Sequence, residues 1–552
     1  MDSQRDILKN KTYLYLTEFF SGMAVMAVEL GASRLLAPYF SSSQIVWTII
    51  IATIMIAMAL GNIYGGKSAD RDPNPDRLYR RLLIAAVWIA AIPLLGKYII
   101  IGITGLLVIA VNQNFLIIAA FFACMIIFVF PCFLLGTCTP SLARYTVSSL
   151  DDSGRTVGTL GAFNTIGSII GTFLPTFVTI PAVGTAVTFL IFSGVLLVLS
   201  LIYFVSRKTG KRAVAVSVVL FLICSVFGHG SEFAFWENDL TYEGESIYNY
   251  LQVRETPDSV ILSTNVLFGV QSVLMKSDSL TGMYYDYAMA APVMAGITGA
   301  RESGVQTSAA QEAPDAGSGR PRMLILGMGT GTFARQCSRY FGEMEVCGVE
   351  IDEKITELAR TYFDEPESAV VTTYDGRAYL DADKTKYDVI MVDAYQDITI
   401  PFQMSSAEFF SSVRDHLTEN GVMVVNMNMR SSSPDGINVY LADTIAGIFP
   451  FVQTVDVAGS TNRELFAAMH EITGGEFAAS ASQIGDPDLR AMMERVGEDL
   501  TDYASTGHLL TDDKAPVELL GMQAIDEIIR DELGYYKEVY RRDGIQGILG
   551  MV

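Results

Sequence analysis

Long apolar runs fill the first part of the chain and end near residue 230. A membrane-spanning helix needs about 20 apolar residues, because lipid offers no partners to open backbone groups. The segments with this pattern are residues 12–38, 44–66, 80–96, 98–112, 114–147, 156–180, 183–206 and 212–229. The third and fourth are short and are separated only by Gly96 and Lys97, so they could form one kinked helix. The pattern predicts an α-helical polytopic membrane domain over residues 1–235.

A different pattern follows this predicted membrane domain. Residues 236–300 contain short runs with period-two alternation, which is typical of strands and predicts a small β subdomain. Residues 301–320 are polar and rich in Ala, Gly and Ser, which predicts a flexible loop. Over residues 321–552, strand and helix patterns alternate, as in an α/β Rossmann-like domain with a parallel sheet. The chain is therefore expected to be a multi-domain protein.

Basic residues predict how the helices would cross a membrane. The start of the chain and the loop 65–81 are rich in Lys and Arg, so both are expected in the cytoplasm. The basic segment 207–212 should also lie inside, yet one more apolar segment follows it. Eight spans would place the C-terminal half in the cytoplasm and this segment outside. Seven spans would do the reverse, and we favour eight because the ligand inferred below is cytoplasmic.

The overall charge limits the partners of the C-terminal half. Residues 1–235 carry 16 Lys and Arg and 10 Asp and Glu, which is a net charge of +6. The whole chain has a net charge of −22, so the remaining residues carry −28. A surface this acidic repels phosphates, which argues against a nucleic-acid partner. The six cysteines and four histidines lack metal-ligand spacing, so no metal is expected.

Two features of the apolar half have alternative interpretations. Gly158, Gly161, Gly167 and Gly171 indicate closely packed helices first, with a substrate path as the alternative. Glu18 shares a helix with the acidic Glu29, and charges in lipid are costly and often functional. The alternative is an interfacial Glu18 and a Glu29 whose charge a neighbouring helix satisfies.

A glycine-rich turn links a strand to a helix in residues 322–341. Gly327, Gly329 and Gly331 allow a tight turn and the close approach of a ligand to the backbone. Acidic residues follow three later strands, namely Glu350, Asp375 and Asp393. Because ligands of parallel sheets bind at the carboxyl ends of the strands, these groups are expected to converge on one crevice. NAD binding is the rival hypothesis, but the spacing GxGxG differs from GxGxxG and lacks a dedicated pyrophosphate cradle.

Several motifs resemble those of the spermidine synthase family, the aminopropyltransferases, and within it the bacterial proteins that carry a transporter-like membrane half. The motifs of the apolar half are ELGASRLLAPYF (29–40), GNIYGGKSADR (61–71) and GTLGAFNTIGSIIGT (158–172). Those of the C-terminal half are ESIYNYLQV (245–253), TGMYYDYAMAAP (281–292), the glycine turn, VEID (349–352), YDGR (374–377), DAY (393–395), IPFQMSSAEFF (400–410) and LTDDKAPVE (510–518). The resemblance covers nearly the whole chain.

The resemblance implies a class I methyltransferase-like or spermidine synthase-like domain that binds an adenosyl sulfonium. Glu350 would bind ribose, Asp375 would bind the adenine amino group, and Asp393 would orient or deprotonate the attacking amine. The implied ligand-binding residues are Gln252, Gly327, Gly329, Thr330, Gly331, Glu350, Ile351, Asp375 and Gly376. The implied catalytic residues are Asp393, Tyr284 and Tyr395.

The chain departs from the family pattern at two acids. Thr330 stands where the family has the aspartate that holds the amine of decarboxylated S-adenosylmethionine, and Gln396 replaces the second active-site acid. Loss of the first acid removes a charge that would repel the carboxylate of intact S-adenosylmethionine. Alternatively, nearby acids take over these roles, and the candidates are Asp286, Asp397, Asp512 and Asp513.

These departures favour one function and leave others open. The first hypothesis is a lyase or cyclase that cleaves the sulfur–alkyl bond of S-adenosylmethionine and releases methylthioadenosine. The alternatives are aminopropyl transfer from decarboxylated S-adenosylmethionine to a polyamine, methyl transfer, and a nucleotide-sensing domain that regulates a transporter-like half. The expected partners are the adenosyl substrate and the lipid bilayer, with a homo-oligomer as an option. The expected location is the bacterial inner membrane, with the C-terminal domain in the cytoplasm.

Overall fold

The computed structural model describes residues 10–40, 43–110, 115–146, 153–230, 232–237, 240–266, 270–299, 319–364, 369–394, 400–428 and 433–549. Contacts divide the chain into two units. The first comprises residues 1–238, 243–250 and 265–267, and the second contains the rest. Most of the predicted loop 301–320 lies outside the described residues, as do Tyr395, Gln396 and Asp397.

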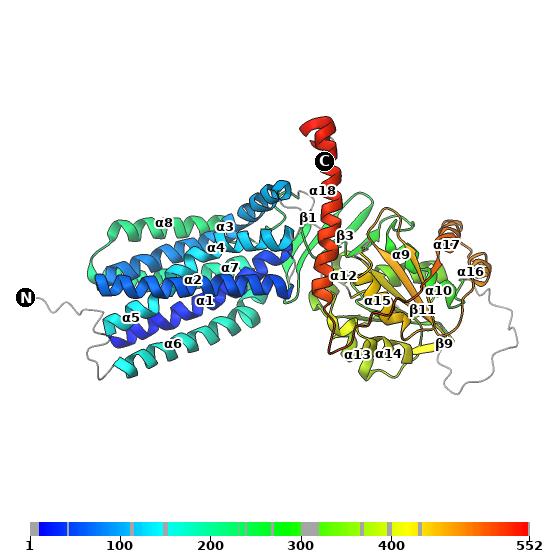
Figure 1. Cartoon of the computed structure of the whole chain (residues 1–552), viewed down its shortest axis with the longest axis horizontal. Helices are drawn as coiled ribbons and strands as arrows, with labels where there is room; N and C mark the ends of the chain where they lie inside the picture. Colours follow the sequence, from blue (N-terminus) through cyan, green and yellow to red (C-terminus); the bar gives the residue numbers. More distant parts are fainter. Residues whose placement is uncertain are drawn as a thin grey trace, which may run out of the picture. The chain divides into compact units, whose positions relative to one another are not determined.

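The first unit is a bundle of long helices that run side by side (Figure 1). Its helices are α1 (Lys11–Phe40), α2 (Gln44–Arg71), α3 (Pro75–Ala110), α4 (Phe115–Gly136), α5 (Cys138–Thr146), α6 (Ser153–Leu174), α7 (Ile180–Arg207) and α8 (Lys211–Phe227), with a π-helical turn η2 (Pro175–Thr179) between α6 and α7. The segments 80–96 and 98–112 fall in one helix, α3, which continues through Pro93. The described helices therefore make seven passages along the bundle, since α5 continues α4.

Five helical stretches within the described residues are long and apolar enough to cross a membrane, judged by length and composition. They are Lys11–Phe40, Gln44–Arg71, Pro75–Leu107, Phe115–Thr146 and Ser153–Arg207. The last stretch contains both α6 and α7, and Gly184 interrupts it with a φ of 77°. Helix α8 is shorter than any of them, with 17 residues.

Glycines bring the backbones of α1 and α6 into direct contact. A Cβ atom on Gly167 would lie 1.9 Å from the carbonyl oxygen of Phe19, and one on Gly171 would lie 2.2 Å from that of Met23. The packing interpretation of these two glycines is confirmed. It is wrong for Gly158 and Gly161, because among the described residues no atom lies within 4 Å of a Cβ atom built there.

Replacing Gly167 by alanine is therefore expected to destabilise the bundle. The new methyl group would overlap backbone rather than a movable side chain, and overpacking of this kind costs about 1–3 kcal/mol. The thermal unfolding temperature of the purified Gly167→Ala protein in detergent should fall. Gly158→Ala is the matched control, because its methyl group enters open space and alanine favours a helix. An equal unfolding temperature for both variants would contradict this account of the α1–α6 contact.

Glu18 is fully buried in the bundle and receives hydrogen bonds from two other helices. The hydroxyl of Thr139 on α5 and the amide of Asn164 on α6 both donate to its Oε1 atom, the amide at 2.9 Å. Its other oxygen has no partner among the described residues. Neighbouring helices thus satisfy one oxygen of this carboxyl group, which is not exposed.

A small antiparallel sheet follows the bundle in sequence. It contains β1 (Leu240–Glu245), β2 (Tyr250–Glu255), β3 (Ser259–Ser263) and β4 (Ser272–Met275) in the order β1-β2-β3-β4. Strand β4 is joined to the larger domain through Thr332, whose hydroxyl donates to the carbonyl of Val273 and accepts from its amide. The small sheet therefore lies against the start of the helix that follows the glycine turn.

The second unit is built on an eight-stranded sheet in the order β12-β10-β11-β9-β8-β5-β6-β7. Its strands are β5 (Arg322–Leu326), β6 (Glu345–Glu350), β7 (Ala369–Thr373), β8 (Tyr387–Val392), β9 (Leu417–Met427), β10 (Phe451–Asp456), β11 (Arg463–Ala468) and β12 (Thr501–Asp502). Strands β5 to β9 are parallel, and the other three are antiparallel. The central parallel strands are continuous apolar runs because both faces are covered.

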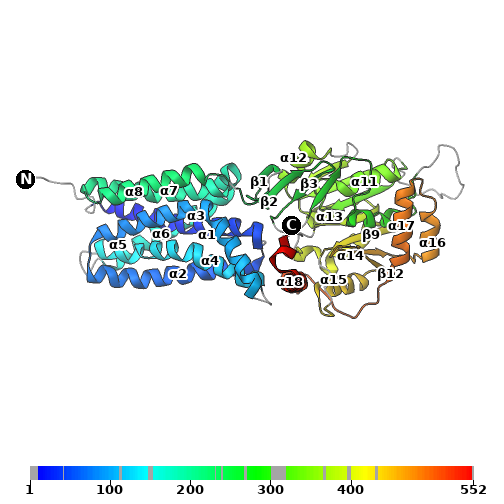
Figure 2. The same cartoon turned by 90° about the horizontal axis from the view of Figure 1, so that it is seen from above.

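Helices pack on both faces of this sheet (Figure 2). The helices of this unit are α9 (Tyr284–Ala288), α10 (Ala290–Met294), α11 (Thr332–Phe341), α12 (Glu353–Tyr362), α13 (Gly376–Ala382), α14 (Ala407–Asp415), α15 (Ile437–Ala446), α16 (Gly474–Ala481), α17 (Pro487–Asp499) and α18 (Val517–Leu549), with a short 3-10 turn η3 (Phe402–Met404). Among them, α16 packs on α10 and α17, and α18 packs on α15. The α/β Rossmann-like fold predicted from the sequence is confirmed. Strand order reverses beside β5, which pairs with both β6 and β8. In open parallel sheets, ligands bind at such a reversal, outside the carboxyl ends of the strands.

Candidate active site

The glycine turn after β5 crosses the ends of two neighbouring strands. The amides of Gly327 and Met328 both donate to the carbonyl of Val349 on β6, at 2.9 and 3.0 Å. Gly327 has a φ of 90°, and a Cβ atom there would lie 2.5 Å from the carbonyl oxygen of Asp393. The backbone conformation and the lack of space exclude a side chain at this position. Glycine therefore allows the end of β5 to lie directly beside Asp393, the predicted base, at the end of β8.

Glu350 closes the turn from β6. Its Oε2 atom accepts a hydrogen bond from the amide of Gly329 at 2.9 Å, and its Oε1 atom accepts one from the amide of Asp352 at 3.0 Å. Burial raises the pKa of Glu350 to about 7, although these amide bonds oppose the rise. Each oxygen keeps a lone pair for another donor, so the carboxylate can receive two hydroxyl groups side by side.

Asp393 directly follows β8 and lies in a buried polar cluster. The hydroxyl of Tyr284 donates to its Oδ2 atom at 2.7 Å, and the amide of Asn426 donates to its Oδ1 atom at 3.0 Å. Burial raises the pKa of Asp393 to about 7, against the effect of these two hydrogen bonds. A carboxylate with such a pKa can accept a proton near neutral pH and is fixed in orientation by both donors.

Most other predicted site residues lie around the same sheet edge. Asp375 follows β7, caps α13 by accepting from the amide of Ala378 at 2.8 Å, and precedes Gly376, the first residue of that helix. Ile351 follows Glu350 and is 38% exposed, so it offers an apolar surface next to the carboxylate. Gln252 lies half-buried in β2, opposite Ser263, within the small sheet. The predicted catalytic Tyr395 lies outside the described residues.

Thr330, at the tip of the turn, is fully buried. Its amide donates to the hydroxyl of Ser272 at 3.1 Å, but its own hydroxyl has no partner among the described residues. The turn thus presents an uncharged polar group where the family pattern has a carboxylate.

Two of the acids proposed to compensate for Thr330 and Gln396 have other partners. Asp286 accepts hydrogen bonds from the amides of Thr281 and Gly282 and from the hydroxyl of Thr281, which fixes the turn before α9. Asp512 forms a two-pronged ion pair with Arg377 at 2.6 and 2.7 Å. Asp513 is exposed. Asp286 and Asp512 therefore have structural roles and are not expected to replace the missing carboxylates.

Sequence reasoning missed Asn426 and Glu464. Asn426 is the second-to-last residue of β9 and follows a buried apolar run, so the strand-end rule used for Glu350, Asp375 and Asp393 could have found it. Glu464 lies in the antiparallel strand β11, where its only signal is a charge beside the apolar run Leu465 to Ala468.

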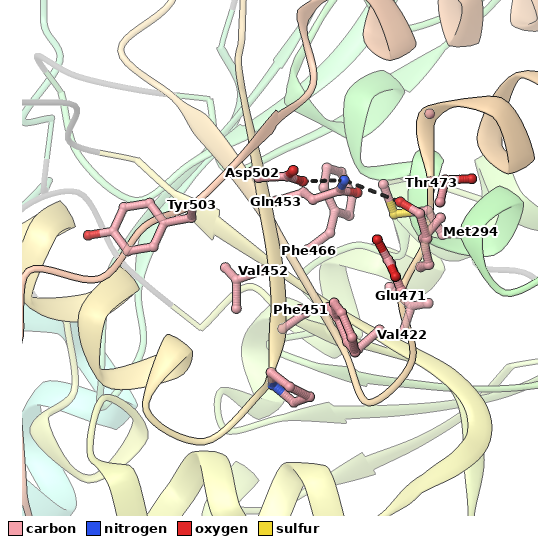
Figure 3. A pocket seen from close by; sticks show the side chains of 15 residues that line it. Met294, Val422, Phe451, Val452, Gln453, Phe466, Glu471, Thr473, Asp502 and Tyr503 are labelled. Carbon is pink, nitrogen blue, oxygen red and sulfur yellow. Dashed lines mark hydrogen bonds between the residues drawn. The ribbon is translucent and has the colours of Figure 1, made fainter.

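A pocket also lies away from these residues. It has a volume of about 460 Å³ and is lined by Val422, Gln453, Glu471 and Asp502 among others (Figure 3). Val422 pairs with Val389 near the start of β8, whereas Asp393 follows the end of that strand. The pocket is thus at the opposite end of the sheet from Asp393. The residues that line it include none of the predicted site residues, and no His, Cys, Asp or Glu cluster able to hold a metal occurs among the described residues.

Comparisons with known proteins agree on one family. The spermine/spermidine synthase domain family matches residues 315–448. The probable polyamine aminopropyl transferase of Bifidobacterium longum is 52% identical over 371 residues, covering 64% of this chain and 78% of that protein. The polyamine aminopropyltransferase of Vibrio vulnificus is 26% identical over 217 residues, covering 38% of this chain and 65% of that protein. This chain thus spans a little under two thirds of the length of the Vibrio protein.

Solved structures with similar chains were also found. A probable spermidine synthase from Corynebacterium glutamicum has 18% identity and a TM-score of 0.36, covering 49% of this chain and 96% of that one. Spermidine synthase from Thermotoga maritima has 19% identity and a TM-score of 0.33, covering 45% and 79%.

The fold and the site define an α/β domain with a nucleotide-type crevice, where a glycine turn meets carboxylates at the ends of parallel strands. Given the identity and coverage of the Bifidobacterium relative, this chain belongs to the spermidine synthase, or polyamine aminopropyltransferase, family. The resemblance of the sequence motifs to the spermidine synthase family is confirmed.

Proposed function

We propose that this protein transfers the aminopropyl group of decarboxylated S-adenosylmethionine to a polyamine such as putrescine. Asp393 removes one proton from the acceptor ammonium group. The free amine then attacks the carbon next to the sulfonium, the carbon–sulfur bond breaks, and its electron pair leaves with methylthioadenosine. The new secondary amine keeps its remaining protons as an ammonium group, and Asp393 releases its proton to water.

The observation that carries this proposal is the fixed geometry of Asp393. Tyr284 and Asn426 each hold one of its oxygens, and the glycine turn passes directly beside its backbone. A base held in this way needs no reorientation when the amine arrives, which lowers the barrier. Glu350 and Asp375 lie at the ends of the next strands of the sheet, where they can receive ribose and adenine.

Product analysis of the purified full-length chain tests this function. With decarboxylated S-adenosylmethionine and putrescine, mass spectrometry should show methylthioadenosine and spermidine in equal amounts. Neither product should form when putrescine is omitted. Absence of methylthioadenosine from this mixture would contradict the proposal, and S-adenosylhomocysteine formed from S-adenosylmethionine would indicate methyl transfer instead.

Thr330 supports a second candidate function, cleavage of intact S-adenosylmethionine. The donor side of the turn carries an uncharged, unpartnered hydroxyl group, which does not repel a substrate carboxylate. That carboxylate, or the substrate's own amine, would displace methylthioadenosine from the same carbon. The same assay separates the two functions, because a lyase would release methylthioadenosine from S-adenosylmethionine without any added amine.

We also propose that the helical unit spans the bacterial inner membrane. The five long apolar stretches support this placement. Seven passages from a cytoplasmic start would place the C-terminal domain outside. The substrates of the proposed reaction are cytoplasmic, and a cytoplasmic C-terminal domain with seven passages instead places the start of the chain outside, against the prediction from its basic residues. Protease digestion of right-side-out spheroplasts and of inverted vesicles distinguishes the two arrangements. We expect the C-terminal domain to be cleaved only in inverted vesicles, and cleavage in intact spheroplasts would overturn the cytoplasmic placement.

A further inference from the structure

Glu464 is a buried carboxyl group with no evident structural purpose. Its side chain has no exposed surface, and neither of its oxygens has a partner among the described residues. An ionised carboxylate in such a place is strongly disfavoured unless a cation or several donors lie next to it. An apolar residue would fit the strand better, because Leu465 and Phe466 follow it.

The register of the sheet places Glu464 beside the candidate base. Glu464 pairs with Asn426 on β9, and paired residues of antiparallel strands point to the same face of a sheet. Asn426 donates its hydrogen bond to Asp393, so the two carboxyl groups share one face. Burial first, and then the charge of Asp393, raise the pKa of Glu464 well above its ordinary value.

Among the described residues, the groups next to Glu464 on the adjacent strands and on α9 supply no positive charge. Its other strand neighbour is Val455 on β10. On α9, which packs on β9 and β11, the titratable groups are the carboxyl of Asp286 and the phenols of Tyr284, Tyr285 and Tyr287. Tyr284 donates to Asp393, Tyr285 donates to the carbonyl of Gln271, and Tyr287 accepts from the amide of Ala458.

Charge balance in the proposed reaction suggests what Glu464 does. The donor carries a sulfonium and an ammonium group, and a diamine acceptor carries two ammonium groups. Thr330 contributes no negative charge at the donor end, and Asp286 and Asp512 have other partners. A further carboxylate close to Asp393 would balance the acceptor ammonium in an environment of low dielectric constant, where charge interactions are strong.

We propose that Glu464 is the second carboxyl group of the acceptor-amine site, and that it ionises as the amine binds. The proton leaves for the solvent, and Asp393 and Glu464 together neutralise the ammonium group that lies against Asp393. Glu464 thus acts as a binding and positioning residue for a cationic amine, while Asp393 alone removes the proton before attack. This inference rests on the proposed aminopropyl transfer for the identity of the amine.

Calorimetric titration of the full-length protein with putrescine, in the presence of methylthioadenosine, tests the inference without turnover. Measurements in buffers with different ionisation enthalpies give the number of protons released on binding. At pH 7, Glu464→Gln should release fewer protons than the wild type and should bind putrescine 10- to 100-fold more weakly. Glu464→Asp should restore part of both, and Glu419→Gln, an exposed change on neighbouring β9, should alter neither.

Steady-state kinetics then separates this role from a general structural one. Glu464→Gln should raise the KM for putrescine at least tenfold and leave the KM for decarboxylated S-adenosylmethionine within twofold. An unchanged proton count together with an unchanged putrescine affinity overturns the inference, even if the wild type makes spermidine. If the wild type makes no spermidine, but binds putrescine with a proton release that Glu464→Gln abolishes, the inference stands and the proposed function fails.

Discussion

Replacing Asp393 by asparagine should lower the turnover number for methylthioadenosine release by about 10²- to 10⁴-fold, the usual contribution of a general base. Asparagine has nearly the same shape and can keep a hydrogen bond from Tyr284, but it cannot accept the proton of the ammonium group. Initial rates with saturating decarboxylated S-adenosylmethionine and putrescine measure the effect. Affinity for methylthioadenosine should stay within a few-fold, because the contacts proposed for the adenosyl group are with Glu350 and Asp375 instead.

A matched control separates this effect from general damage. Asp415→Asn removes an exposed carboxylate at the end of α14 and should leave the rate unchanged. A rate for Asp393→Asn within tenfold of the wild type would exclude Asp393 as the base. Another group at this sheet edge would then have to accept the proton.

The pH dependence follows from the raised pKa of Asp393. Activity should increase as the pH rises through about 7, because only the ionised form accepts a proton. Stability should change in the opposite sense. In the unfolded chain this carboxyl ionises near pH 3.8, so below that pH the group is neutral in both states and its burial carries no charge penalty. The stability that this neutral burial provides is lost as the pH rises through 7, the pKa of the folded state. Asp393→Asn should therefore gain stability relative to the wild type between pH 5 and pH 8, as measured by thermal unfolding.

The parts of the site predicted from sequence are those that depend on local pattern. A glycine turn after a buried strand fixes its own conformation, and acids after successive strands must meet because parallel strands end at one edge. Glu350, Asp375 and Asp393 therefore fall where the sequence indicates. The interaction of Asp393 with Tyr284 agrees with a role that only the family resemblance had suggested.

The parts missed depend on contacts between distant segments. Glu464 approaches Asp393 because β11 inserts between β10 and β9 in antiparallel register, and no local pattern encodes that order. The number of helices in the apolar half was also uncertain for a local reason. Hydropathy falls at Gly96 and Lys97, yet α3 continues because the Lys97 ammonium group donates to the carbonyl of Glu232, at 2.9 Å, within the same unit. The hydrogen bond to Glu232, which is distant in sequence, thus offsets the cost of burying the charge of Lys97, and the helix continues where hydropathy alone suggests a break.

Replacing Glu350 by glutamine should weaken binding of methylthioadenosine by about 10- to 100-fold. A hydrogen bond to a charged acceptor contributes about 1.5–3 kcal/mol, and the amide can accept only one of the two ribose hydroxyl groups that the carboxylate can receive. Because burial raises the pKa of Glu350 to about 7, wild-type affinity should also decline as the pH falls below 7, and the variant should lose this pH dependence.

Isothermal titration with methylthioadenosine between pH 5.5 and pH 8 measures both effects on the Glu350 variant. Glu353→Gln, which changes an exposed acid three residues along the chain, is the matched control and should bind like the wild type at every pH. Thermal unfolding checks that the turn survives, because the amides of Gly329 and Asp352 donate to different oxygens of Glu350 and the glutamine side chain keeps only one of them. A folded Glu350→Gln protein with wild-type affinity would show that the adenosyl group does not bind at the end of β6. The crevice at the β5–β8 reversal would then have to bind its substrate by other contacts.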